Sequence, residues 1–174
     1  MDIEELDDLI KKHGGALYGF CHRLAGNKAD TDDLYQETFL KAMELRHRMN
    51  SSLNPKAFLL AIAARLRKNS RRKWAWRQRI APTAELNDAS NRASLAASEF
   101  SPEEAILSGE LRGTIQAAAA TLDDKLKVPL YMHYTADLSI DEIAEALGIP
   151  PGTVKSRLYK ARKAIKSILE AEPL

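Results

Sequence analysis

The sequence predicts an all-α fold of two small helical domains joined by a flexible linker, the C-terminal one a helix-turn-helix. Apolar residues recur at three- and four-residue steps along most of the chain, which is the period of an amphipathic helix. This period is lost over residues 80–101, which are rich in Ala, Ser, Asn and Asp. We therefore divide the 174 residues into a domain at 1–79, a linker at 80–101 and a domain at 102–174.

The first domain is expected to contain three helices. The first spans residues 3–24, and a glycine and an asparagine follow it. The second spans 30–49 and has acids in its first turn, where carboxylates suit the helix dipole. Asn54 and Pro55 have the form of an N-cap followed by proline at the first helical position. They predict a third helix that runs to about residue 79.

The second domain is expected to begin with two helices. Ser101, Pro102 and Glu104 combine a capping box with proline at the first helical position. A further helix is expected at 124–136, in which Pro129 removes one backbone donor. The apolar stripe expected on the earlier helix is Leu107, Leu111, Ile115, Ala118 and Leu122.

The most specific pattern is a helix-turn-helix over residues 138–169. Ser139 and Glu142 form a capping box before a short helix, which Gly148 ends. A longer helix follows the turn, and its opposite face carries long donors that can reach phosphates and base edges. We therefore expect it to bind DNA rather than to be merely a solvated basic helix. The apolar positions of the longer helix are Val154, Leu158, Ala161, Ile165 and Ile168.

The net charge of +2 conceals two cationic blocks. Residues 51–80 carry nine basic and no acidic side chains, and residues 151–174 carry six basic and two acidic ones. Trp74 and Trp76 lie among the cations of the first block. Positive charge with aromatic rings suits single-stranded nucleic acid, but either tryptophan could equally pack into the core.

A polar helix face precedes the first cationic block. Asp33, Gln36 and Glu37 are spaced to project together, with Phe39 and Met43 nearby. Such a face could dock a basic helix of another protein, or it could be an ordinary surface.

Several classes of function are excluded by composition. A single cysteine rules out an intramolecular disulfide framework and any multi-cysteine metal site. The longest apolar run has eight residues, far short of the roughly 20 that span a bilayer. The acidic N-terminus does not have the pattern of a signal peptide. We expect a cytoplasmic protein that is not an enzyme, with no cofactor, metal site, membrane insertion or small-molecule substrate.

These motifs together resemble the sigma-70 family of RNA polymerase sigma factors, extracytoplasmic-function (ECF) type. DDLYQETFLKA is similar to the region 2 helix that binds core polymerase, and NPKAFLLAIAARLRKNSRRK to the promoter-melting helix. LSIDEIAEALGIPPGTVKSRLYKARKAI is similar to region 4. The resemblance implies that core RNA polymerase, promoter DNA and an anti-sigma protein are partners. It also implies that the linker threads toward the active-site cleft of the polymerase.

The resemblance assigns the site residues in three sets. Contacts to the polymerase clamp helices fall on Asp32, Asp33, Gln36, Glu37, Phe39 and Met43. Recognition and opening of the minus-ten element fall on Arg65, Lys68, Asn69, Arg71, Arg72 and Lys73, with the preceding loop 48–54. Recognition of the minus-thirty-five element falls on Ser139, Thr153, Lys155, Ser156, Arg157, Tyr159, Lys160 and Lys163, of which Ser139 and Thr153 would contact phosphates.

Three positions depart from the family pattern. Arg65 replaces the asparagine of the melting helix, Asn69 replaces its aspartate, and Met43 stands where a tryptophan is common. The alternative hypothesis is a stand-alone helix-turn-helix regulator of duplex DNA. That class needs a dimerisation surface or an effector pocket, and residues 1–79 suggest neither.

Overall fold

The computed structural model describes residues 1–49, 54–80 and 102–171, with 102–108 as backbone only. The described residues are helical and contain no strand, which confirms the predicted all-α fold. The predicted linker and the Ser101 cap lie outside the described residues. The elements are α1 (Ile3–Ala25), α2 (Lys28–Leu45), the 3-10 turn η1 (Arg46–Arg48), α3 (Pro55–Ile80), α4 (Pro102–Ala120), α5 (Asp124–Tyr134), α6 (Ile140–Leu147) and α7 (Pro151–Ala171).

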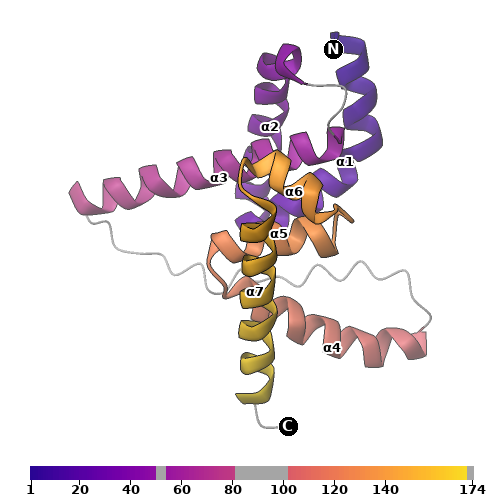
Figure 1. Ribbon diagram of the computed structural model, residues 1–174, viewed down its shortest axis with the longest axis vertical. Helices are drawn as coiled ribbons and strands as arrows, with labels where there is room; N and C mark the ends of the chain where they lie inside the picture. The colour runs from indigo at the N-terminus through magenta and orange to yellow at the C-terminus, as the bar shows by residue number, and fades with distance from the viewer. Residues whose placement is uncertain (50–53, 81–101, 172–174) are drawn as a thin grey trace.

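Helices α1, α2 and α3 pack together through apolar faces (Figure 1). Leu17 and Phe20 of α1 and Leu59 of α3 are fully buried among them. The start of α3 follows the sequence prediction, because the Lys56 amide donates to Asn54 Oδ1 at 3.0 Å and Pro55 is the first helical residue. The second helix ends at Leu45, earlier than predicted, and continues as η1.

Helices α5, α6 and α7 form the second packed group, and α4 packs on α7. Ala118 of α4 is buried, but Leu111 and Ile115 are 60% and 39% exposed. The predicted apolar stripe of this helix is therefore wrong at those two positions. Only the C-terminal end of α4 meets the body, and the rest projects away from it (Figure 1). The side chain of Leu107 lies outside the described residues.

The two groups of helices also pack against each other. Helix α3 contacts α5 and α6, and α1 contacts α5, so that one continuous buried cluster includes residues from both groups. Polar contacts also join them: Asn54 Nδ2 donates to Glu142 Oε2, and Arg71 Nη1 lies 2.8 Å from Asp124 Oδ2. Among the described helices, none is long and apolar enough to cross a membrane.

Candidate functional site

The helix-turn-helix forms as the sequence predicts. The Glu142 amide donates to Ser139 Oγ at 3.1 Å, and the Ser139 amide donates to Glu142 Oε1 at 3.0 Å. These two bonds close the capping box of α6. Gly148 ends α6 at φ 67°, a left-handed conformation that glycine adopts without steric cost. The Val154 amide then donates to the Pro150 carbonyl at 3.2 Å, which starts α7.

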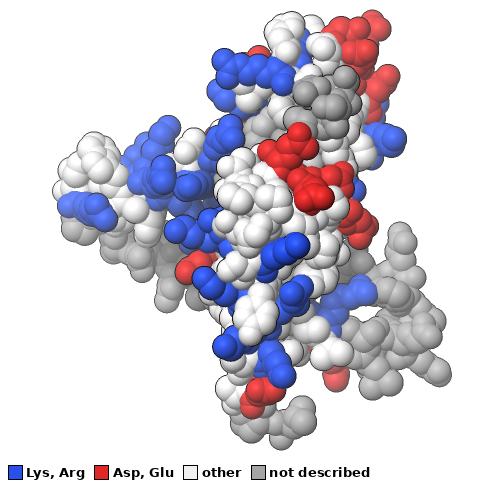
Figure 2. Space-filling model, in the orientation of Figure 1, with Lys and Arg blue, Asp and Glu red and all other residues white. Residues whose placement is uncertain are grey.

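Helix α7 separates an apolar face from a cationic one. Val154, Leu158 and Ala161 are buried against the body. The opposite face places cations in solvent (Figure 2), while acidic side chains gather over α6. This arrangement presents donors along one helix, as binding in the DNA major groove requires. Of the residues predicted to contact the minus-thirty-five element, Ser139, Lys155, Ser156, Tyr159, Lys160 and Lys163 are exposed, and Thr153 and Arg157 are half-buried.

The residues predicted to contact the minus-ten element lie on α3. The side chains of this set are all exposed to solvent: Arg65, Lys68, Asn69, Arg71, Arg72 and Lys73. Arg71 is nevertheless held by the Asp124 carboxylate at the start of α5. Residues 50–53 of the predicted loop lie outside the described residues.

A small charged cluster joins α3 to α5. Arg67 is half-buried there, and the cost of burying its charge lowers its pKa, as does the neighbouring Arg71. The Asp124 carboxylate acts in the opposite direction and raises the pKa of Arg67. Within the described part of the chain, Arg67 Nε and Asp124 Oδ1 are buried without a hydrogen-bond partner. The inner side of α3 therefore carries its charges against the second half of the protein.

Helix α2 divides the predicted polymerase-contacting residues between two environments. Asp33, Gln36 and Glu37 are exposed together, as predicted. Asp32 instead accepts a 2.7 Å hydrogen bond from the Tyr18 hydroxyl of α1. Leu40, which was not predicted, is 61% exposed and lies on the face of Gln36 and Glu37 by its three- and four-residue spacing. The sequence signal for Leu40 is an apolar residue three or four positions after the polar residues Gln36 and Glu37.

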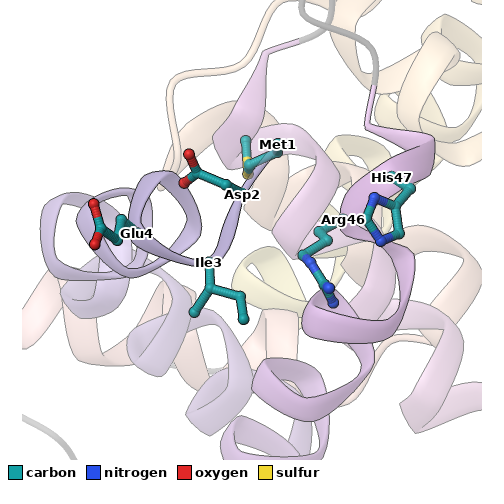
Figure 3. A pocket seen from close by; sticks show the side chains of 6 residues that line it. All are labelled: Met1, Asp2, Ile3, Glu4, Arg46 and His47. Carbon is teal, nitrogen blue, oxygen red and sulfur yellow. The ribbon is translucent and has the colours of Figure 1, made fainter.

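Phe39 and Met43 lie on the adjacent flank of α2 and line a hollow beside α1. The hollow has a volume of about 400 Å³ and is also lined by Ile3 and Leu6. A second hollow of about 730 Å³ continues from it between the start of α1 and η1 (Figure 3). The polar face of α2 thus borders a hollow lined by apolar side chains and by the acids Glu4, Asp7 and Asp8 of α1. Residues lining the second hollow are Met1, Asp2, Ile3, Glu4, Arg46 and His47.

Two further features concern nucleophilic and metal chemistry. Cys21 is fully buried, and burial raises the pKa of its thiol to about 12. A thiol with that pKa is a weak nucleophile at neutral pH. In the part of the chain that is described, no group of three or more His, Cys, Asp or Glu residues could hold a metal ion.

Comparison with known proteins identifies the family. The family model "Sigma-70 region 2" matches residues 9–78, and "Sigma-70, region 4" matches residues 112–165. The chain is 30% identical over 172 residues to the ECF RNA polymerase sigma factor SigW of Bacillus subtilis, covering 97% of this chain and 90% of the relative. The chain belongs to the sigma-70 family. Region 2 contains α2 and most of α3, and region 4 contains the helix-turn-helix of this sigma factor.

Two solved structures have a similar fold. The sigma factor RpoE in complex with the anti-sigma factor NepR from Bartonella quintana aligns with a TM-score of 0.74 at 17% identity, over 98% of this chain and all of that chain. CnrH in complex with the cytosolic domain of CnrY aligns with a TM-score of 0.65 at 18% identity, over 99% of this chain and 92% of that chain. The predicted family and fold class are therefore confirmed.

Proposed function

We propose that this protein is a transcription initiation factor that binds core RNA polymerase and directs it to promoters. The single observation that carries the proposal is the presence of regions 2 and 4 of the sigma-70 family in one chain. A stand-alone helix-turn-helix regulator would account for region 4 alone. It would leave the polar face of α2 and the cationic face of α3 without a role.

Helix α7 is proposed to recognise the minus-thirty-five element in the major groove. Lys155, Lys160 and Lys163 are exposed and can reach phosphates or base edges. The Ser139 hydroxyl oxygen already accepts a hydrogen bond from Glu142, so its hydroxyl proton is left to donate to a phosphate. The buried apolar face fixes α7 to its own domain, and DNA contact is thereby confined to the opposite face.

Helix α3 is proposed to hold the minus-ten element, with an altered set of contacts. Arg65 and Asn69 share a face by their four-residue spacing, and both are exposed. A guanidinium and an amide there offer hydrogen-bond donors where the family pattern has an amide and a carboxylate. The energy for opening the duplex would come from binding, and the phosphodiester chemistry is left to the polymerase.

The polar face of α2 is proposed to dock on core polymerase. Asp33, Gln36 and Glu37 are exposed beside Leu40, and the hollow lined by Phe39 and Met43 lies on the adjacent flank. Acids around an apolar centre match a basic partner helix. An anti-sigma protein is proposed as a further partner, because the similar RpoE fold was solved with one. The cytoplasm, where core polymerase acts, is the proposed location.

Co-migration with core RNA polymerase on a sizing column tests this function. We expect the wild-type chain to co-migrate. The double variant Gln36→Ala, Glu37→Ala should lose at least about tenfold in affinity, since both side chains would lie within the contact. Glu170→Ala, an exposed acid near the end of α7, is the matched control and should bind normally. A wild-type chain that does not bind core polymerase would favour the stand-alone regulator instead.

A further inference from the structure

The outer end of α3 carries two exposed tryptophans. This end of the helix extends beyond the other helices (Figure 1). Trp74 is 54% exposed and Trp76 is 64% exposed, so neither packs into the core. Tryptophan has a large apolar ring that is usually well covered by protein. A pair of exposed rings on a projecting helix therefore indicates a surface that another molecule covers.

The two rings lie on opposite sides of α3. Residues two apart on an α-helix are separated by about 200° around its axis. Trp76 follows Asn69 and Arg72 by seven and four residues, which places it on the outer face of α3. Trp74 follows Arg67 and Arg71 by seven and three residues, which places it on the inner face.

The inner and outer faces differ in what already occupies them. On the inner face Arg67 is half-buried and Arg71 forms an ion pair with Asp124 of α5 at 2.8 Å. On the outer face Arg65, Arg72 and Lys73 are exposed, and no ion pair involving them forms within the described residues. The outer face is thus a strip of cations with a tryptophan at its far end and no acid between residues 51 and 80.

We propose that Trp76 is a stacking platform for an unpaired base of single-stranded DNA. Aromatic rings stack on bases of any sequence, and neighbouring cations hold the backbone, which is how single strands are bound without sequence preference. Arg72 and Lys73 supply the cations. Asn69 and Trp76 are seven residues apart, about 10 Å along the helix axis, so one strand lying along α3 can meet both. Trp74, on the other side, takes no part.

This inference rests on the proposed function and extends its minus-ten surface by about one helical turn, from Lys73 to Trp76. The alternative occupant of this face is a protein, either core polymerase or an anti-sigma partner. The cationic strip argues against an unrelated apolar partner, because a protein interface centre is usually poor in charge. A strand of phosphates matches the strip in both charge and length.

Fluorescence of single-tryptophan variants tests the proposal, because the chain has only these two tryptophans. Trp74→Phe leaves Trp76 as the sole indole, and Trp76→Phe leaves Trp74. Each full-length variant is titrated with a mixed-sequence DNA strand of about 20 nucleotides, and separately with the duplex of that strand. We expect the single strand to quench Trp76 strongly and Trp74 little. Equal quenching of both would overturn the proposal.

Affinity measurements provide the second arm. Trp76→Ala should lower the affinity for the single strand by about tenfold or more, while Trp74→Ala, the matched control, should change it by less than about twofold. Equal effects of the two variants, or an equal loss for duplex DNA, would overturn the proposal. Core polymerase binding should be unchanged in Trp76→Ala. A loss of polymerase binding with normal DNA binding would show that the occupant is a protein, and would also overturn it.

The outcome is separable from that of the proposed function. If the wild-type chain binds core polymerase and Trp76→Ala has no effect on DNA, only the stacking role fails. If the chain does not bind core polymerase, the sigma function fails whatever the tryptophan variants do.

Discussion

The hydrogen bond from Asn54 to Glu142 should stabilise the packing of the two groups of helices measurably. Asn54 caps α3 and Glu142 belongs to the capping box of α6, and the bond between them spans 88 positions of sequence. Glu142→Ala removes this bond together with one arm of the capping box. Asn54→Ser keeps an N-cap of comparable quality, but its side chain is too short to reach the Glu142 carboxylate.

The expected magnitude follows from the geometry. A hydrogen bond to a charged group contributes about 1.5–3 kcal/mol, and we take about 1 kcal/mol because the Glu142 carboxylate is only half-buried. Loss of the capping arm adds about 1 kcal/mol. Glu142→Ala should therefore lower the free energy of unfolding by about 2 kcal/mol and the Tm by about 4–8 °C. Asn54→Ser should lower it by about 1 kcal/mol, and the coupling of the two in a double-mutant cycle should be about 1 kcal/mol.

The contribution of Glu142 should also depend on pH. Its hydrogen bonds with the Ser139 amide and with Asn54 lower the pKa of Glu142 below its ordinary value of 4.5. A lowered pKa in the folded state means that this stabilisation is fully present above pH 4.5 and is lost as the pH falls through the folded-state pKa. Urea unfolding followed by circular dichroism, from neutral to acidic pH, measures it. A coupling below about 0.3 kcal/mol, or a difference between wild type and Glu142→Ala that does not shrink in acid, would refute this reasoning.

Three further predictions concern single residues. Lys160→Ala should weaken DNA binding and reduce the slope of log affinity against log salt concentration by about one ion. Lys166→Ala is the control, because Lys166 lies outside the predicted site and its ammonium is 4.0 Å from the Glu170 carboxylate. Equal salt slopes for the two variants would contradict the assignment. Cys21 is fully buried and its thiol pKa is raised to about 12, so it should react with a thiol reagent at least about tenfold more slowly than an ordinary cysteine until the chain unfolds. Fast labelling of the folded protein would show that the thiol is accessible. Asp124→Asn should release Arg71 on α3 and raise the affinity for DNA up to about fivefold, measured by fluorescence anisotropy. Asp123→Asn, at the neighbouring exposed acid, is the control and should leave the affinity unchanged.

The local features of the fold could be predicted because their causes lie within a few residues of sequence. Ser139 and Glu142 form a capping box whose partners are three positions apart, and both of its hydrogen bonds are present. Gly148 ends α6 because this position has a positive φ, which glycine adopts without steric cost. The buried stripe of α7 follows from the helical period alone, and Val154 and Leu158 are buried as predicted.

Features that depend on distant segments could not be predicted. The contacts between Asn54 and Glu142, and between Arg71 and Asp124, join positions whose proximity no local pattern encodes. The apolar spacing of α4 indicates a buried stripe, but Leu111 is exposed because that part of the helix has no neighbour to pack against among the described residues. The sequence alone left the packing of Trp74 and Trp76 open, and the structure shows both exposed. The roles of individual residues in DNA and polymerase binding stay predictions.

The central claim is that this chain directs core RNA polymerase to specific start sites. The most direct measurement is transcription in vitro from genomic DNA of the source organism by core polymerase, with and without the protein, followed by sequencing of transcript 5′ ends. We predict discrete new start sites that depend on the protein and share two conserved upstream elements. They should be lost when Gln36 and Glu37 are both replaced by alanine. Identical 5′ ends with and without the wild-type protein would contradict the account.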